Sequence, residues 1–276
     1  MAIYKDPFRV GENKLVLCET YNHKKEPTQS NKRHFCKITM EKAKDQQPWF
    51  GIEQEYFLLQ KNGRPLGWPD CGIPGEEGPP YCGVGASKMF GRYIAESHYR
   101  ACLYAGITIF GINAEMVPSE WEFQIGPCEG ISIGDDVLMA RYILERIAEE
   151  YGAEISYDPK PFEGNWYPAE LHVNFSTNEM RKENGIEAIE EAIKKLENKN
   201  LEHIKAYYPE NKTENVSIPS WVFKFGSGVG NRQTTIRIPR LVADAKSGYF
   251  EERRCRSDND PYTVTEILAK TVCLNE

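Results

Sequence analysis

The stretch Trp49-Phe50-Gly51-Ile52-Glu53-Gln54-Glu55-Tyr56-Phe57-Leu58 decides the fold, because two carboxylates interrupt an otherwise largely apolar run. A strand sends alternate side chains to opposite faces, so this run predicts a strand with Glu53 and Glu55 on one face. Acidic side chains are rarely buried without a partner, and neighbouring carboxylates repel each other. The pair therefore indicates either a cation in front of the strand, most simply a divalent metal, or a sheet face open to water.

Similar ligand atoms recur on or next to short apolar segments further along the chain, at Glu115, Glu122, His172 and Glu251. Hard cations such as Mg²⁺ and Mn²⁺ take carboxylates with at most an occasional imidazole, whereas structural zinc favours closely spaced thiolates. The eight cysteines include no Cys-x-x-Cys pair. The six candidate ligands therefore favour Mg²⁺ or Mn²⁺ over structural zinc.

The run Gln233-Thr234-Thr235-Ile236-Arg237-Ile238 predicts a strand with Arg237 on the face opposite the two isoleucines. Arginine suits phosphate and carboxylate because its planar fork donates two parallel hydrogen bonds. Arg232 and Arg253 are further cations of this kind. Metal ions with arginines are what phosphoryl transfer needs, although a strand with a solvated polar face remains the alternative.

Longer motifs resemble the catalytic domain of eukaryotic-type glutamine synthetase, the glutamate–ammonia ligase. They run in order over nearly the whole chain, and they lie at residues 48–56, 81–86, 114–115, 121–130, 164–166, 172–177, 231–240 and 248–251. The resemblance implies an α+β fold in which a curved, mainly antiparallel sheet is backed by helices, with the site on its concave face. It also implies ATP-dependent phosphorylation of the γ-carboxylate of glutamate, followed by attack of ammonia on the acyl phosphate.

The resemblance assigns roles to individual residues. It implies two sites for Mg²⁺ or Mn²⁺, one held by Glu55, Glu115 and Glu122 and the other by Glu53, His172 and Glu251. It places Asn165, Trp166 and Arg253 at the amino-acid substrate, and it makes Arg232, Arg237 and Arg253 the catalytic cations. Around ATP it places Trp49, Glu122, Phe123, Gln124, Ile125, Gly126, Pro127, Asn174, Phe175, Ser176, Arg232, Arg237 and Tyr249.

The chain departs from the family at the predicted substrate wall. After Gly164-Asn165-Trp166, where the family continues with a glycine-rich turn, this chain has Tyr167-Pro168-Ala169-Glu170-Leu171. Proline fixes φ and removes a hydrogen-bond donor, so both the backbone and the charge of this wall change. Glu170 is predicted either to face a cationic substrate or to be a solvated loop residue.

Two further departures concern whole segments. Residues 207–221 lack the arginine and the His-Glu pair of the family's catalytic flap, and the chain opens at Met1 without the family's small N-terminal β domain. We therefore expect one catalytic domain over residues 1–276, with the family's ring assembly in doubt. The competing hypothesis is a divergent paralogue that binds nucleotide and metal but no longer ligates and acts as a structural or regulatory subunit.

Periodic apolar positions predict helices over residues 91–105, 135–151 and 186–196. The sequence Thr263-Val264-Thr265-Glu266 resembles a capping box that opens a C-terminal helix. The glycine-rich run 226–230 lacks the Lys-Ser/Thr of a P-loop and is predicted to be a turn that presents Arg232. His98 is predicted to be a packed or hydrogen-bonded histidine without a functional role.

Composition excludes several function classes. A net charge of −7 with dispersed basic residues argues against a nucleic-acid or anionic-membrane partner. No apolar run reaches membrane-spanning length, and the first residues lack a signal-peptide pattern, so we expect a cytoplasmic protein with small-molecule substrates, and a homo-oligomer is an open expectation. The scattered cysteines predict reduced thiols.

Overall fold

The computed structural model describes residues 1–9, 11–69, 81–162, 166–209 and 220–276. Its centre is an eight-stranded sheet in the order β4-β5-β3-β7-β10-β9-β8, with β6 paired to the far end of β3. Among the described strands, β8 and β9 are the parallel pair and the other pairs are antiparallel. The strands are β3 (Trp49–Leu59), β4 (Ile109–Ala114), β5 (Glu120–Glu129), β6 (Glu154–Ser156), β7 (Glu170–Ser176), β8 (Ser227–Val229), β9 (Ile236–Ile238) and β10 (Phe250–Arg256). The expected α+β class with a mainly antiparallel sheet is confirmed.

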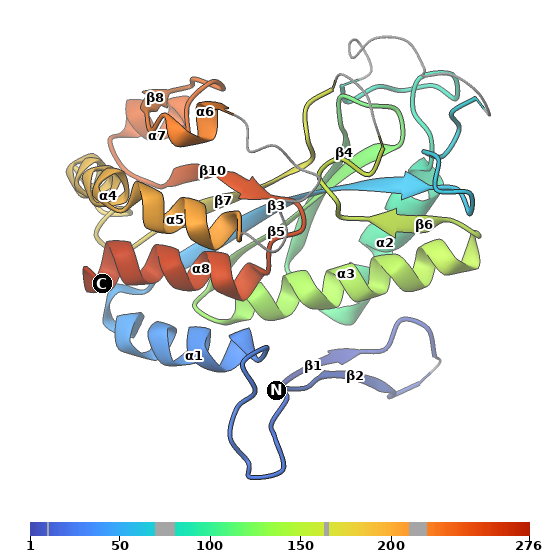
Figure 1. Ribbon diagram of the computed structural model, residues 1–276, viewed down its shortest axis with the longest axis horizontal. Helices are drawn as coiled ribbons and strands as arrows, with labels where there is room; N and C mark the ends of the chain where they lie inside the picture. Colours follow the sequence, from blue (N-terminus) through green and yellow to red (C-terminus); the bar gives the residue numbers. More distant parts are fainter. Residues whose placement is uncertain (10, 70–80, 163–165, 210–219) are drawn as a thin grey trace.

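Helices back one face of this sheet, as Figure 1 shows. Helices α2 (Arg92–Ala105) and α3 (Ser132–Glu150) pack on β4, β5 and β3, and α5 (Asn200–Tyr207) packs on β10. Outside them, α8 (Pro261–Ala269) lies against α3 and α1 (Lys32–Ala43). The remaining elements are η1 (Lys44–Gln46), α4 (Ile186–Asn198), α6 (Ser220–Phe223), α7 (Arg240–Ala245) and the π-helical turn η3 (Lys270–Leu274).

The N-terminal residues form a separate two-stranded hairpin of β1 (Ala2–Lys5) and β2 (Lys14–Leu17). It is attached to the helical layer by Tyr4, whose hydroxyl donates to Asp136 Oδ1 of α3 at 2.8 Å. In Figure 1 the hairpin lies beyond the helices, on the side of the molecule away from β8. It therefore does not reach the exposed face of the large sheet.

Alternation along β3 separates two faces of the sheet. The even-numbered residues Phe50, Ile52, Tyr56 and Leu58 are fully or almost fully buried in the main apolar core beneath the helices, which we call the core face. Gln54 shares this face and accepts a hydrogen bond from Arg141 Nε of α3 at 2.9 Å. Glu53 and Glu55 consequently point to the opposite face, which we call the site face.

The helix predictions were accurate except at some ends. The predicted helix 91–105 is α2, which ends at Gly106 in the left-handed conformation (φ +86°), and 186–196 lies within α4. Helix α3 begins three residues before the predicted start at 135. His98 is buried and its Nε2 lies 3.0 Å from the Ala140 carbonyl oxygen, which confirms a packed, hydrogen-bonded histidine.

Two local predictions were wrong. The C-terminal helix begins at Pro261, and its N-cap is Asp260, whose side chain accepts from the Thr263 amide at 3.0 Å, so Thr263 is not the cap. Proline is favoured at the first helical position because its missing N–H needs no partner there. Residues 227–229 of the glycine-rich run form strand β8 rather than a turn, because they pair with β9.

Within the part of the chain that the structure describes, no helix is long and apolar enough to cross a membrane. The seven described cysteines are all free thiols, as predicted.

Candidate active site

Three glutamates from three segments converge on the site face of the sheet. Glu55 of β3 pairs directly with Glu122 of β5, and Glu115 follows β4 on the far side of β5. All three are buried, and each offers an oxygen within 4.8 Å of the others. We call Glu55, Glu115 and Glu122 the first triad, and they are the residues that the resemblance assigned to one metal.

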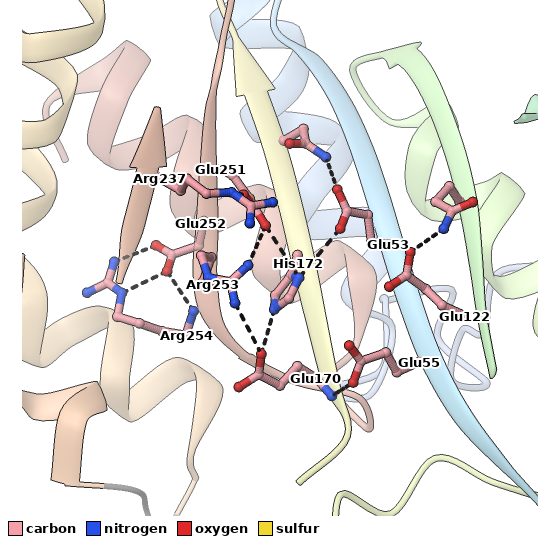
Figure 2. Close-up of polar contacts among 12 residues, drawn as sticks. Glu53, Glu55, Glu122, Glu170, His172, Arg237, Glu251, Glu252, Arg253 and Arg254 are labelled. Atoms are coloured by element: carbon pink, nitrogen blue, oxygen red, sulfur yellow. Dashed lines mark hydrogen bonds and ion pairs between the residues drawn. The ribbon is translucent and has the colours of Figure 1, made fainter. Parts of the chain in front are cut away.

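A second group lies beside it, one strand further along the sheet. Glu53 of β3 pairs with His172 of β7, and Glu251 comes from β10 on the other side of β7. His172 Nδ1 lies 3.5 Å from Glu53 Oε2 and 3.4 Å from Glu251 Oε1. Figure 2 shows His172 between these two carboxylates. We call Glu53, His172 and Glu251 the second triad.

Amide groups hold the carboxylates of both triads in place. Asn113 donates to Glu115 Oε1 at 3.0 Å, Asn174 donates to Glu53 Oε1 at 2.8 Å, and Gln124 donates to Glu122. The backbone amide of Glu170 donates to Glu55 Oε2 at 2.5 Å. Such supporting hydrogen bonds orient ligands before a metal arrives.

Electrostatics distinguish the first triad, because burial and neighbouring carboxylates outweigh the charges of His172 and Arg232 that act on it. Burial, together with the charges of Glu115 and Glu120, raises the pKa of Glu55 well above its usual value. Burial and the charges of Glu53 and Glu115 raise the pKa of Glu122 to about 8. Burial also raises the pKa of Glu115. A hard divalent cation would stabilise the ionised form of these three buried carboxylates, and carboxylate oxygens are the ligands that such a cation prefers.

The second triad is compensated within the protein. Burial acts to raise the pKa of Glu53, but His172, the hydrogen bond from Asn174 and the charge of Arg237 together outweigh it and lower that pKa to about 2. Arg253 Nη1 donates to Glu251 Oε1 at 2.8 Å, and Arg237 Nε forms an ion pair with Glu251 Oε2. The same two arginines are therefore within reach of anything bound beside Glu251, as Figure 2 shows.

Five of the six triad residues line a cavity of about 780 Å³, and Glu251, which contacts Arg237 and Arg253, is the one that does not. The predicted residues that line it are Glu53, Glu55, Glu115, Glu122, His172, Arg232, Arg237 and Arg253. Tyr167, Pro168 and Glu170 of the predicted substrate wall also line it. The sequence prediction had not assigned a role to the other lining residues, which are Tyr81, Met116, Glu120, Trp221 and Gln233. Alternation along β5 already placed Glu120 on the face of Glu122, and that signal could have identified it.

The residues predicted around ATP lie mostly at one end of the sheet. Trp49 pairs with Ser176 of β7, and Tyr249 immediately precedes β10. Trp49 and Tyr249 are each 39% exposed, and the Arg181 guanidinium lies 4.1 Å from the Trp49 ring centre. Phe123, Ile125 and Phe175 are fully buried on the core face, so among the atoms of these three residues only backbone atoms can reach a ligand on the site face.

The predicted substrate residues are placed differently from one another. Arg253 lines the cavity. Trp166 packs in a small aromatic cluster with Trp68 and Phe162 and is not among the cavity-lining residues. Asn165 lies outside the described residues.

Gly126 and Pro127, which were predicted to lie around ATP, are in β5 beyond Ile125, towards the end of the sheet that carries Trp49.

Comparisons with known proteins give consistent results over the whole chain. The family described as "Glutamine synthetase, catalytic domain" matches residues 29–204. The chain is 53% identical to glutamine synthetase of Panulirus argus over 282 aligned residues, which cover 100% of this chain and 78% of that protein. It is 52% identical to the glutamine synthetase of Homo sapiens and 51% identical to that of Mus musculus, again over its full length and over 75% and 76% of those proteins.

Proposed function

The chain belongs to the glutamine synthetase family, and on this premise we propose that it is an ATP- and divalent-metal-dependent ligase. The proposed reaction forms an amide from glutamate, or a related carboxylate, and ammonia or another amine through an acyl phosphate. The single observation that best supports it is the convergence of five triad residues and three arginines on one cavity, with Glu251 behind two of these arginines. A group-transfer reaction on phosphate requires this combination.

The family implies divalent metals, and we propose Mg²⁺ or Mn²⁺ in two sites. The first triad would hold one ion and the second triad the other. When bound, the ions neutralise charge on phosphate oxygens. The donor set supports this assignment, because five carboxylates and one imidazole are the ligands of hard cations, and burial raises the pKa values of the first triad.

We propose that the three arginines stabilise charge on the transferred phosphoryl group and on the carboxylate substrate. Arg237 and Arg253 both contact Glu251, so their guanidinium groups are held at the edge of the second triad. Arg232 also lines the cavity, with its guanidinium carbon 5.6 Å from the Tyr81 ring centre, and its charge acts on Glu115 of the first triad. Cations already positioned in a cavity can stabilise an anionic group without reorganising during the reaction.

For ATP, we propose that the base lies at the end of the sheet that carries Trp49 and Tyr249. Trp49 precedes Glu53 by four residues in β3, which corresponds to about 13 Å along a strand. An extended triphosphate would then run from the exposed aromatic side chains to the two triads. Two runs assigned to ATP, from Glu122 to Pro127 and from Asn174 to Ser176, lie on the two strands that flank β3, and Arg237 lies on β9.

The remaining assignments are also proposals. We propose that Arg253, Trp166 and Asn165 contribute to substrate binding, that residues 1–276 form one catalytic domain, and that the protein is cytoplasmic, a compartment that suits its free thiols. The family implies small-molecule substrates and oligomerisation, and we propose a homo-oligomer.

The proposed function is tested by ADP release from ATP and Mg²⁺ in the presence of ammonium and a panel of carboxylates, with hydroxylamine replacing ammonium to trap the acyl phosphate as a hydroxamate. We expect glutamate-dependent ADP release with formation of γ-glutamyl hydroxamate. Arg237→Ala should abolish both, whereas the exposed Arg100→Ala should change neither, because Arg100 lies on the outer surface of α2. Nucleotide and metal binding without hydroxamate from any carboxylate would contradict ligation and favour the non-ligating paralogue.

A further inference from the structure

The two ring nitrogens of His172 face different partners. Nδ1 points to Glu53 and Glu251, the other members of the second triad, at 3.5 and 3.4 Å. Nε2 lies 2.6 Å from Oε2 of Glu170, on the other side of the ring. Figure 2 shows the imidazole between these partners. In the second triad the metal-facing nitrogen is therefore Nδ1, and Nε2 is left for Glu170.

A metal-binding histidine needs a lone pair on one nitrogen and a proton on the other. The second nitrogen usually donates to a carboxylate or carbonyl, which fixes the tautomer and ring orientation and makes the ligating nitrogen more basic. Losing such a partner typically weakens metal binding about 10- to 100-fold. Glu170 has the right chemistry for this role, because its carboxylate can accept a hydrogen bond from a protonated Nε2. The lone pair of Nδ1 is then free to bind a metal.

Glu170 is itself held in place by its surroundings. It lies two residues before His172 in β7, so both side chains project from the same face of the strand. Its backbone amide donates to Glu55 Oε2 at 2.5 Å, and its side-chain Oε2 lies 3.9 Å from Arg253 Nη2. With its side chain only 18% exposed, this carboxylate differs from the solvated loop residue that was one of the two expectations for it.

We propose that Glu170 is a positioning residue that holds His172 as the Nε2-protonated tautomer, so that Nδ1 is presented to the metal of the second triad. This inference rests on the proposed function, because it assumes that the second triad binds a metal. Glu170, Glu55 and His172 also lie close enough together to hold a metal ion. Direct ligation by Glu170 is therefore the competing role that the experiment must separate.

The test titrates the full chain with Mn²⁺ alone and follows free Mn²⁺ by electron paramagnetic resonance. Glu170→Gln keeps an oxygen acceptor for Nε2, whereas Glu170→Ala and the length-matched Glu170→Met remove it. Glu154→Gln is the charge-matched control, because Glu154 is exposed on β6. Far-UV circular dichroism and thermal unfolding in EDTA establish that each variant is folded.

We expect two Mn²⁺ sites in the wild type. The Ala and Met variants should weaken one of the two about 10- to 100-fold and leave the other unchanged, while the Gln variant loses less than about fivefold. The control should match the wild type. Because the Gln variant keeps the acceptor, its rescue of affinity is the result that a general structural role would not produce.

Two results would overturn the inference. One is wild-type affinity at both sites in the folded Ala and Met variants, and the other is a Gln variant as weak as these two, which would indicate direct ligation by the charged carboxylate. A wild-type protein that binds no Mn²⁺ is a separate outcome, because it would reject the proposed metal sites themselves. The failure of the inference and the failure of the proposed function are therefore distinguishable.

Discussion

Glu122 is a residue whose burial opposes stability in the absence of metal. Its pKa is raised to about 8, while the unfolded chain would have a value near 4.5. The folded state therefore binds the Glu122 proton more tightly than the unfolded state, so this group destabilises the fold progressively as pH rises from about 4.5 to 8. Function and stability are then in conflict at this position.

We predict that Glu122→Gln stabilises the metal-free protein by about 1–3 kcal/mol at pH 8, because glutamine cannot ionise. The same variant should bind Mn²⁺ at one site at least tenfold more weakly. Urea unfolding in EDTA and in Mn²⁺ measures both effects. A variant that is less stable than the wild type in EDTA would contradict the electrostatic account of the first triad.

At the same scale, alternation in the sequence placed Glu53 and Glu55 on one face of a strand, and the structure agrees. That the six side chains bind metal stays a prediction. The hydrogen bond from His172 to Glu170 was not predicted, because the choice between the two ring nitrogens depends on how β7 lies beside β3 and β10. Such contacts depend on the register of neighbouring strands, which alternation within one strand does not determine.

Among the elements, β10 carries charged residues on both of its faces. Glu251 and Arg253 face the site, whereas Glu252 and Arg254 are completely buried beside α5. Arg254 Nε donates to Glu252 Oε1 at 2.8 Å, and Arg254 also contacts Asn200 at the start of α5. A buried ion pair of this kind is costly to break, because the remaining charge has no partner.

We predict that Arg254→Met lowers the free energy of unfolding by about 3–5 kcal/mol, because it leaves the Glu252 carboxylate buried without its cation. Adding Glu252→Leu should restore most of that loss, since the double variant replaces the pair by apolar groups. Urea unfolding of the two variants measures the difference. A double variant less stable than the single one would show that the pair contributes more than mutual neutralisation.

The elements also show where local sequence was insufficient. Strand β3 and helix α2 were predictable, since one has a clear period of two and the other ends in a glycine. Strand β8 was mistaken for a turn because its glycines have no strand signal of their own, and only pairing with β9 makes them extended. The start of α8 was misplaced because Asp260 followed by Pro261 is a stronger start than Thr263.

For the molecule as a whole, two buried histidines make stability depend on pH. Burial lowers the pKa of His98, which belongs to α2 and contacts α3, to about 4. Burial lowers the pKa of His203 in α5 to about 4 as well. In the unfolded chain both would titrate near 6.5, so the unfolded state binds more protons between pH 6.5 and 4. Their contribution to stability is complete above pH 6.5 and is lost as the pH falls towards 4.

We predict that this effect removes about 2 kcal/mol per histidine between pH 7.5 and pH 5. His98→Gln, which cannot be protonated, should reduce the loss for the whole protein by about that amount, whereas the exposed His23→Gln should leave it unchanged. Urea unfolding at the two pH values provides the measurement. An unchanged pH dependence in the His98 variant would show that His98 is not the group that responds.

The central claim concerns the whole molecule, since it requires segments from four strands and the residue after β4 to hold two metal ions in one cavity. Its most direct test is anomalous diffraction at the manganese absorption edge from crystals grown with Mn²⁺ and ADP. We predict two peaks per chain, one among Glu55, Glu115 and Glu122 and one among Glu53, His172 and Glu251. Manganese peaks absent from both triads, in crystals where ADP is bound, would contradict the account.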